Sequence, residues 1–431
     1  MQGRVACYFG REDARFCGGG RTYDSFVRYR PVRGDSALGA LGVKETVVPK
    51  DEAVSLLQRI LQIDTTNPPG NELEAAQILD DFFRAHGIET EVDEFLSGRA
   101  NLLARLPGEG RDQPSLMLCG HMDVVPAGGT AWEADPFAAE LRDGKIYGRG
   151  ASDMKSGLAA MAIAVANLRQ AQTTLPGDVL FAATASEEVD CRGARRFVER
   201  GVLEGVGAVV IAEPTRGDVI LAHKGALWVE ITTRGKSAHG SAPETGVNAI
   251  EHMHHVLDEL LQNLRFEVDP DPALGAPTLS VGRIDGGVAV NVVPDECRLQ
   301  IDIRTVPAQD HGEILQDIEQ RIDSLQDNFP DLNYEIEVMQ ERLAVTTPEE
   351  ERIVQVAEGL REETYDSPSS RAGASYYTDA SVLTESYPDL AVVLYGPGDD
   401  RLAHQPNECV DVESFVRSIG FYEQLAARYF G

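Results

Sequence analysis

The chain has 431 residues, of which 42% are hydrophobic and 25% are charged, the composition of a globular protein long enough for two domains. Its formal net charge is −31, so its surface repels phosphate backbones and anionic lipids. The same charge could also reflect salt adaptation. No segment approaches the roughly 18 consecutive apolar residues that a membrane helix needs. We therefore expect a water-soluble protein without nucleic-acid or membrane partners.

The six cysteines are scattered along the chain and form neither a CxxC pair nor a regular framework. In a chain of this size, such spacing is typical of reduced thiols rather than of a disulfide scaffold. We therefore expect a cytoplasmic protein.

Residues 1–48 differ from the rest of the chain, because they combine many arginines and a triple glycine with little apolar periodicity. They contain no apolar stretch of about 7–15 residues, which a secretory signal would need. We expect this segment to be a disordered or mis-assigned extension.

Short apolar strands alternate with helices in residues 49–223, which indicates an α/β domain with a largely parallel or mixed sheet. The wholly apolar segment 116–120 predicts a strand that is buried on both faces. The other predicted elements of this part are helices over residues 51–61 and 72–86, strands over 89–95 and 100–106, a helix over 156–171, and strands over 178–185 and 208–212.

The order of elements changes in residues 224–341, and this segment reads as a second domain inserted into the first. Its predicted elements are strand 226–233, helix 247–264, strands 278–285 and 297–304, helix 312–325 and strand 332–339. This β-α-β-β-α-β order is the ferredoxin-like motif. The α/β pattern returns in residues 342–431, with predicted helices over 347–363 and near 379–386, strand 390–394 and a last helix over 411–429.

Side chains that can bind a metal ion follow predicted strands or precede a predicted helix in five segments. The segments are Gly120–Pro126 with His121 and Asp123, Tyr147–Gly157 with Asp153, Ser186–Glu188 with Glu187 and Glu188, Ala212–Thr215 with Glu213, and Ala403–Glu408 with His404. Each segment by itself can be explained without a metal ion. An aspartate before a helix can cap that helix, and two adjacent glutamates can lie in a solvated turn. Open α/β sheets, however, gather such residues at the carboxyl ends of their strands.

Together, two histidines and three to four carboxylates form a ligand set for a pair of divalent ions. Nitrogen and oxygen ligands suit zinc best, with cobalt or manganese tolerated. One carboxylate must bridge the two ions, and one acid is left over to act as a base.

Seven motifs of this chain resemble, in sequence order, a metallopeptidase family. The family comprises acetylornithine deacetylase, succinyl-diaminopimelate desuccinylase, aminoacylase and bacterial glutamate carboxypeptidase. The motifs are GHMDVVPAG, IYGRGASDMKSGLAAM, TASEEVDCRGA, IAEPT, KSAHGSAPETGVNAI, NVVPDECRLQIDIR and YGPGDDRLAHQPNE. The resemblance spans residues 51 to 431 and implies a zinc-exopeptidase-like catalytic domain with an inserted ferredoxin-like lid and dimerisation domain.

The resemblance also implies a role for each matching residue of the metal centre. It assigns His121 and Glu213 to one metal, Glu188 and His404 to the other, and Asp153 to the bridge. Glu187 matches the family's general base, and Asp123 matches the acid that supports the first histidine ligand.

The resemblance further implies substrate-binding residues on the lid. His239 matches a lid histidine that reaches the active site of the partner subunit, so we expect a homodimer. Asn291 and Arg304 match positions that help to bind the carboxylate of the substrate. Residues 373–379 resemble a substrate loop, but their sequence does not identify a substrate.

We therefore expect a metal-dependent deacylase that cleaves the linear amide bond of an N-acyl amino acid. A dipeptidase or carboxypeptidase would use the same site and stays an alternative. A metal-binding homologue without catalysis is disfavoured, since a binding protein has no need of Glu187. Neither the acyl group nor the amino acid can be read from the sequence.

Overall fold

The computed structural model describes residues 48–110, 113–370 and 372–431. The described residues belong to one unit that extends from Glu45 to Gly431. The extension predicted for residues 1–48 stays a prediction, because residues 1–47 lie outside the described part. No helix among the described residues is long and apolar enough to cross a bilayer.

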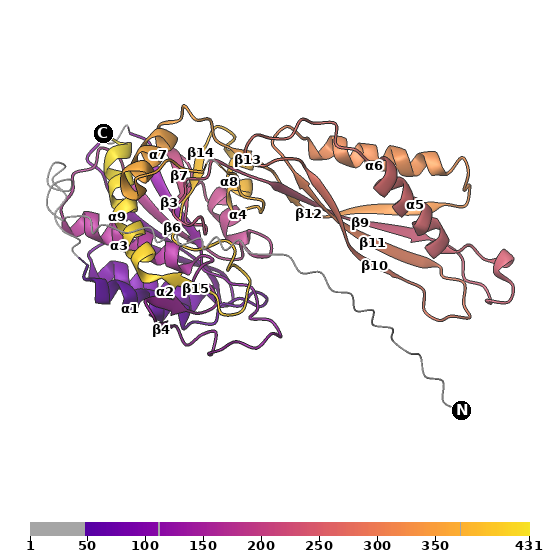
Figure 1. The fold of residues 1–431 in the computed structure, drawn as a ribbon, viewed down its shortest axis with the longest axis horizontal. Helices are drawn as coiled ribbons and strands as arrows, with labels where there is room; N and C mark the ends of the chain where they lie inside the picture. Colours follow the sequence, from indigo (N-terminus) through magenta and orange to yellow (C-terminus); the bar gives the residue numbers. More distant parts are fainter. Residues whose placement is uncertain (1–47, 111–112, 371) are drawn as a thin grey trace, which may run out of the picture. The chain divides into compact units, whose positions relative to one another are not determined.

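A six-stranded mixed sheet forms the centre of the larger part of the protein (Figure 1). Its strands are, in spatial order, β1 (Glu89–Leu96), β2 (Arg99–Leu106), β6 (Val179–Thr184), β3 (Ser115–His121), β7 (Val206–Ile211) and β14 (Ala391–Leu394). Strands β6, β3, β7 and β14 pair in parallel, whereas the β1–β2 and β2–β6 pairs are antiparallel. Every residue of β6 and β14 is buried, which explains why their sequences are apolar except for Thr184 at the end of β6.

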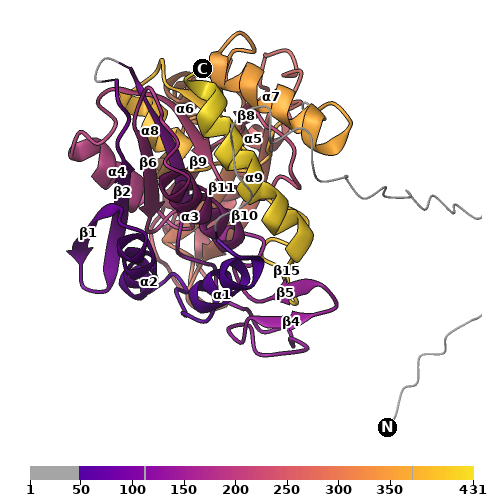
Figure 2. The ribbon, with the colours of Figure 1, turned by 90° about the vertical axis from the view of Figure 1, so that its left-hand side faces the viewer.

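Helices cover both faces of this sheet. They are α1 (Lys50–Leu61), α2 (Glu72–Ala85), α3 (Lys155–Gln170), α4 (Arg192–Glu199), α7 (Arg352–Tyr365), α8 (Ala380–Ser386) and α9 (Val412–Tyr429). Figure 1 shows α3 and α9 on one side of β3, β6 and β7, and α4 and α8 on the other side. Figure 2 views the same sheet from the side of α3 and α9.

Helix α3 is buried from Lys155 to Leu168 and packs against β3, β6, α1 and α9. Small residues along this helix let it approach the sheet closely. A Cβ added at Gly157 would lie 2.3 Å from the carbonyl oxygen of Ala212, so only glycine fits there. The helix thereby holds its first turn against the loop that follows β7.

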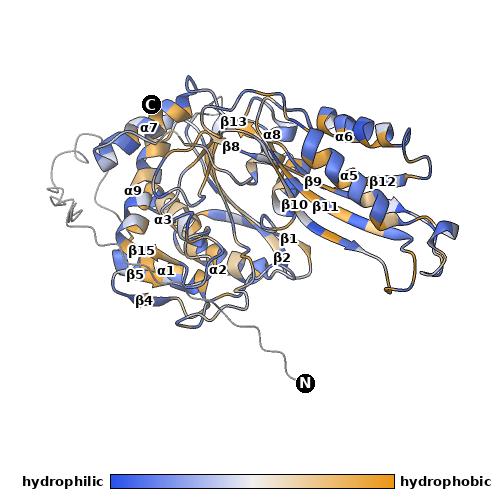
Figure 3. Ribbon diagram, turned by 45° about the vertical axis from the view of Figure 1, so that its right-hand side comes forward, coloured by the Kyte–Doolittle hydropathy of each residue, from blue (hydrophilic) through white to orange (hydrophobic). Residues whose placement is uncertain are grey.

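A separate antiparallel sheet, which we call the lid sheet, has the strand order β10 (Thr278–Gly286), β11 (Glu296–Thr305), β9 (Gly225–Arg234) and β12 (Asn333–Arg342). Helices α5 (Ala249–Asn263) and α6 (His311–Leu325) complete the predicted β-α-β-β-α-β order. Both helices carry hydrophobic and hydrophilic residues in alternation along their length (Figure 3). Their apolar residues, such as Val256 and Ile318, share one buried cluster with Leu227 and Leu299 of the strands. The predicted fold class, a mixed α/β sheet with an inserted lid, is confirmed.

Several short elements were not predicted. They are β4 (Glu140–Arg142), β5 (Lys145–Tyr147), β15 (Cys409–Asp411), β8 (Ala222–His223), β13 (Val345–Thr346) and the 3-10 helix Pro243–Thr245, together with α4. The helix predicted over residues 347–363 begins later, at Arg352. The early start was wrong because Thr347 is tied to the sheet, where its hydroxyl donates to the carbonyl of Val392 at 2.6 Å.

Candidate metal centre

The predicted metal ligands meet at one edge of the six-stranded sheet. His121 is the last residue of β3, and Glu213 follows β7 after one intervening residue. Glu188 lies on the loop after β6, which pairs with β3 in parallel. Since parallel strands end at the same edge, the topology brings these three side chains together.

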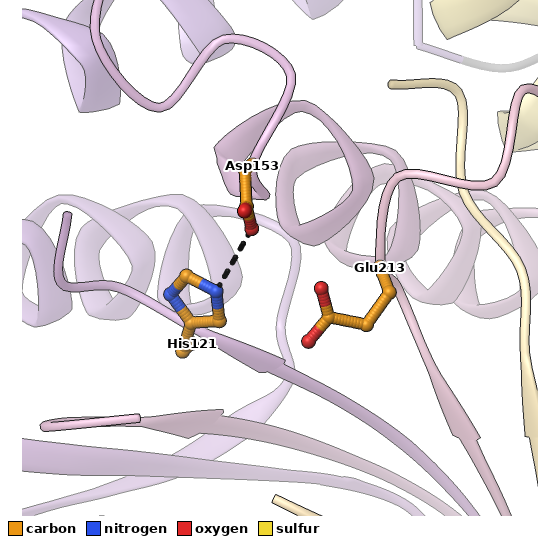
Figure 4. A group of neighbouring side chains, drawn as sticks. All are labelled: His121, Asp153 and Glu213. Carbon is orange, nitrogen blue, oxygen red and sulfur yellow. Dashed lines mark hydrogen bonds and ion pairs between the residues drawn. The ribbon is translucent and has the colours of Figure 1, made fainter. Parts of the chain in front are cut away.

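His121, Asp153 and Glu213 form the first of two candidate ligand groups, which we call the buried group (Figure 4). One ligand atom from each residue lies within 4.8 Å of the others, and Nε2 of His121 is 3.2 Å from Oδ1 of Asp153. The carboxylate of Glu213 points toward the other two side chains. His121 is only 1% exposed and Glu213 only 3% exposed, so water has little access to this group.

Asp153, Glu188 and His404 form the second group, which we call the exposed group. Nε2 of His404 lies 3.2 Å from Oε2 of Glu188 and 3.5 Å from Oδ2 of Asp153. The side chain of His404 is 51% exposed. Asp153 thus directs one carboxylate oxygen to each group, which is the geometry of a bridging ligand.

The crowding of acidic groups shows how strongly this place favours cations. Burial and the neighbouring carboxylates raise the pKa of Glu213 well above its ordinary value. Burial lowers the pKa of His121, but the hydrogen bond with Asp153 and the surrounding carboxylates raise it well above its usual range. These residues fit a pair of divalent cations, because imidazole and carboxylate are the ligands that such ions prefer and the charges of the site need compensation.

Glu187 belongs to neither ligand group, although it lies directly before Glu188. Its side chain is buried, and burial together with the charges of Glu213 and Glu188 raises its pKa well above the ordinary value. A carboxyl group whose pKa is raised from its ordinary value toward the working pH is suited to acid–base work.

Asp123 holds the loop that carries Glu187 and Glu188. Its carboxylate accepts hydrogen bonds from the backbone N–H groups of Glu187 at 3.0 Å and Glu188 at 3.2 Å, and from Nδ2 of Asn67 at 2.9 Å. The contact with His121 is different from the predicted one: Nδ1 of His121 lies 2.9 Å from the backbone oxygen of Asp123 and 3.7 Å from its carboxylate. Asp123 therefore supports the predicted base Glu187 and the predicted ligand Glu188 through their backbone.

Glu408 is the last residue of the motif YGPGDDRLAHQPNE, but no role was predicted for it, and in the structure it bonds to the backbone around the predicted bridging ligand Asp153. Its buried carboxylate accepts hydrogen bonds from the backbone N–H groups of Gly150, Ser152 and Asp153, at 3.1, 2.7 and 2.9 Å. It also pairs with the guanidinium of Arg149 at 2.5 Å. Its place in the motif does not reveal this role, because its backbone partners lie more than 250 residues away in the sequence.

The three predicted lid residues lie outside both ligand groups. His239 is exposed and its Nδ1 lies 2.6 Å from the hydroxyl of Ser241. The backbone of its neighbour Gly240 bonds to that of Asn291, so the two predicted segments lie side by side. Arg304 pairs with Asp302 and lies over the ring of Tyr377, with 5.9 Å between Cζ and the ring centroid.

Asp379, at the end of the predicted substrate loop, is buried near the metal centre rather than exposed to substrate. Its Oδ2 accepts a hydrogen bond from the hydroxyl of Thr184 at 2.6 Å, and Thr184 pairs with His121 in the sheet. Burial raises the pKa of Asp379 to about 6. Asn67 also contributes although no role was predicted for it, because its Nδ2 donates a hydrogen bond to the carboxylate of Asp123.

Residues 117–428 match the family described as peptidase family M20/M25/M40. The chain belongs to this family. It is thus a member of a family of metal-dependent hydrolases, as the resemblance predicted.

Two curated relatives are similar over nearly their whole length. A probable succinyl-diaminopimelate desuccinylase of Staphylococcus aureus (strain MSSA476) is 30% identical over 415 residues, which covers 89% of this chain and 99% of the relative. An acetylornithine deacetylase of Myxococcus xanthus is 32% identical over 387 residues, which covers 87% of this chain and 97% of the relative.

Solved structures share the fold at lower identity. An M20 family metallo-carboxypeptidase from Sulfolobus solfataricus is similar with a TM-score of 0.74 and 19% identity, over 88% of this chain and 99% of that chain. A dinuclear metal-binding peptidase of the M20 family from Bacillus subtilis is similar with a TM-score of 0.68 and 16% identity, over 88% and 98% of the two chains. The family therefore includes a peptidase that binds two metal ions.

Proposed function

We propose that this chain is a two-metal amidohydrolase that cleaves the amide bond of an N-acyl amino acid. The observation that carries the proposal is the pair of ligand groups that share Asp153, with Glu187 beside them and in neither. The two curated relatives support a deacylase, since their names describe a desuccinylase and a deacetylase.

Two divalent cations, for which zinc is the best candidate and cobalt or manganese the alternatives, would supply a water of lowered pKa and would polarise the amide carbonyl. His121 and Glu213 would hold one cation, Glu188 and His404 the other, and Asp153 both. Glu187 takes the proton of the attacking water and later gives it to the leaving amine. Its raised pKa suits both halves of this task.

The lid residues would bind the substrate. Arg304 presents a guanidinium, which can grip a carboxylate with two parallel hydrogen bonds, and Asn291 would assist it. Because the two residues would bind a carboxylate, one of the two products would be an amino acid. His239 would donate to the oxyanion of the tetrahedral intermediate. A dipeptidase or carboxypeptidase that uses the same residues is the second candidate, because it requires the same carboxylate grip.

A screen for amine release tests the reaction. Purified enzyme should release free amine from N-acyl amino acids more rapidly than from dipeptides, as measured with a reagent for primary amines. Glu187→Gln should lower kcat by several orders of magnitude while both metals stay bound, because a base acts in the transition state and a ligand in the ground state. Near-normal turnover of this variant would contradict the assigned base, and a preference for dipeptides would favour the second candidate.

We further propose that two copies form a twofold dimer in which each lid sends His239 into the cleft of its partner. Exposure of the His239 ring supports this arrangement, and a closed dimer makes the contact reciprocal. Mixing the inactive variants His239→Ala and Glu187→Gln under subunit exchange should then restore about a quarter of the wild-type activity, since half the dimers are mixed and each has one competent site. No recovery after proven exchange would mean that His239 does not act between subunits.

A further inference from the structure

The Arg149–Glu408 pair is a buried ion pair behind the metal centre. Arg149 is 2% exposed and Glu408 is fully buried, so neither charge is solvated by bulk water. An ion pair in such a place costs desolvation free energy and persists only when further hydrogen bonds satisfy both partners. Glu408 accepts four such bonds, three from backbone and one from Arg149.

The pair connects three loops that carry metal ligands. Besides its bond to Glu408, the Arg149 guanidinium lies 3.3 Å from the backbone oxygen of Pro126 and 3.4 Å from that of Gln405. Pro126 belongs to the loop after His121, and Gln405 directly follows His404. Its guanidinium also lies 5.2 Å from the ring centroid of Trp132. Glu408 connects the third loop to the pair, because its carboxylate accepts a hydrogen bond from the backbone N–H of Asp153.

We propose that Glu408 is a positioning residue, which fixes the bridging ligand Asp153 relative to His404 and thereby sets the affinity of the exposed group for its metal. The inference rests on the proposed two-metal site. Two ligands of the exposed group depend on Glu408: Asp153 through its backbone N–H, and His404 through the loop that both residues share. The buried group depends on it only through Asp153, because His121 and Glu213 are placed by β3 and β7.

The variant Glu408→Gln tests this role because it changes charge and hydrogen bonding with little change in shape. The amide offers one acceptor oxygen and one N–H₂ donor, whereas every partner of Glu408 is a donor. The amide N–H₂ of the glutamine would therefore face N–H donors of the protein at the place where one carboxylate oxygen of Glu408 accepts their hydrogen bonds. Glu423→Gln is the matched control: Glu423 is also buried and accepts a bond from Asn167 at 2.6 Å, but it lies on α9 away from both ligand groups.

Metal-free wild type and both variants are titrated with cobalt(II), and binding is followed by calorimetry and by visible absorption. Supporting residues of metal ligands typically change affinity about 10- to 100-fold. We expect the second, weaker cobalt ion to bind at least about ten-fold more weakly to Glu408→Gln, with the first changed far less and Glu423→Gln like wild type. Unchanged affinity for the second ion, or an equal loss at both steps, would overturn the inference.

Arg149→Lys provides a second variant if Glu408→Gln does not fold. It keeps a positive charge beside Glu408 but removes the planar fork that reaches Pro126 and Gln405. The affinity for the second cobalt ion should again fall more than the affinity for the first. Affinities equal to those of the wild type would contradict the role. Failure of the wild type itself to bind two ions would instead contradict the proposed metal centre.

Discussion

The two ligand groups share Asp153 but differ in the way that the fold supports them. In the buried group, His121 ends a central strand and Glu213 follows the neighbouring one, and both are almost inaccessible to water. In the exposed group, Glu188 and His404 lie on loops, and the His404 side chain is half exposed. One site is therefore placed by a sheet, whereas the other is placed by loops that need their own support.

Backbone conformation shows the same contrast. Ser186, two residues before Glu188, has φ 71° and His404 has φ 62°, both in the left-handed region that non-glycine residues seldom adopt. Such residues cost of order 1–3 kcal/mol each and persist only when the surroundings fix them. Asp123 accepts hydrogen bonds from the two backbone N–H groups that follow Ser186, and Glu408 accepts one from the backbone of Asp153, which faces His404. Neither needs to contact a metal in order to shape the site.

The largest expected effect separates the two histidine ligands. His121→Ala should remove the metal of the buried group and abolish hydrolysis, because it removes the one imidazole among the three candidate ligands of that group. His404→Ala should lose only the metal of the exposed group, so that about one ion per chain remains. Metal content after gel filtration measures both. Loss of the same single ion in both variants would show that the groups are not independent.

The wild type offers a second test of the same contrast. Dialysis against a weak chelator should release the ion of the exposed group before that of the buried group.

A smaller effect should appear in the pH dependence of metal binding. The pKa values of Glu213 and His121 are raised well above their ordinary values, so in the metal-free protein both keep their protons to a higher pH than free side chains do. Binding must displace these protons, and affinity should therefore rise with pH by about ten-fold per unit for each proton released. The exposed group should show the shallower slope, since the pKa values of Glu188 and His404 are raised less. Cobalt(II) affinities at pH 6, 7 and 8 would measure both slopes, and equal slopes would contradict the expected difference.

The smallest effect concerns a buried carboxyl group outside both ligand groups. Burial raises the pKa of Glu423 to about 7, above the value of 4.5 in an unfolded chain. A raised acid pKa means that the folded state binds the proton more tightly, so this contribution to stability is lost as pH rises from about 4.5 to 7. Glu423→Gln should remove the loss and stabilise the protein by about 1–3 kcal/mol at pH 8 relative to pH 5. The free energy of unfolding of the variant and of the wild type is measured at both pH values. An equal change for both proteins between pH 5 and pH 8 would contradict this assignment.

Much of the fold could be predicted from the sequence because its major elements have clear apolar periodicity. The predicted strands 116–120 and 208–212 are wholly apolar, and β3 and β7 begin and end within one or two residues of them. The three-stranded sheet of β4, β5 and β15 was missed, because each strand has only three residues and Cys409 pairs with Tyr147 across a large sequence separation.

The candidate site was accessible to sequence reasoning only in part. His121 and Glu213 could be predicted because their residue types and their places after strands indicate metal ligands. Both lie in one ligand group of the structure. Glu408 and Asn67 act through hydrogen bonds to residues far away in the sequence, and such partners become visible only once the loops are placed together. The roles of His239, Asn291 and Arg304 still rest on the resemblance.

The insertion of the lid also sets the order in which the metal centre can be assembled during translation. The ribosome releases His121, Asp153 and Glu213 first, then the whole lid sheet, and only afterwards His404 and Glu408. A nascent chain stopped before residue 404 would have every ligand of the buried group and an incomplete exposed group, and its bridging loop would lack the carboxylate that secures it. In the proposed two-metal centre, the exposed group is therefore complete only after the lid has been synthesised.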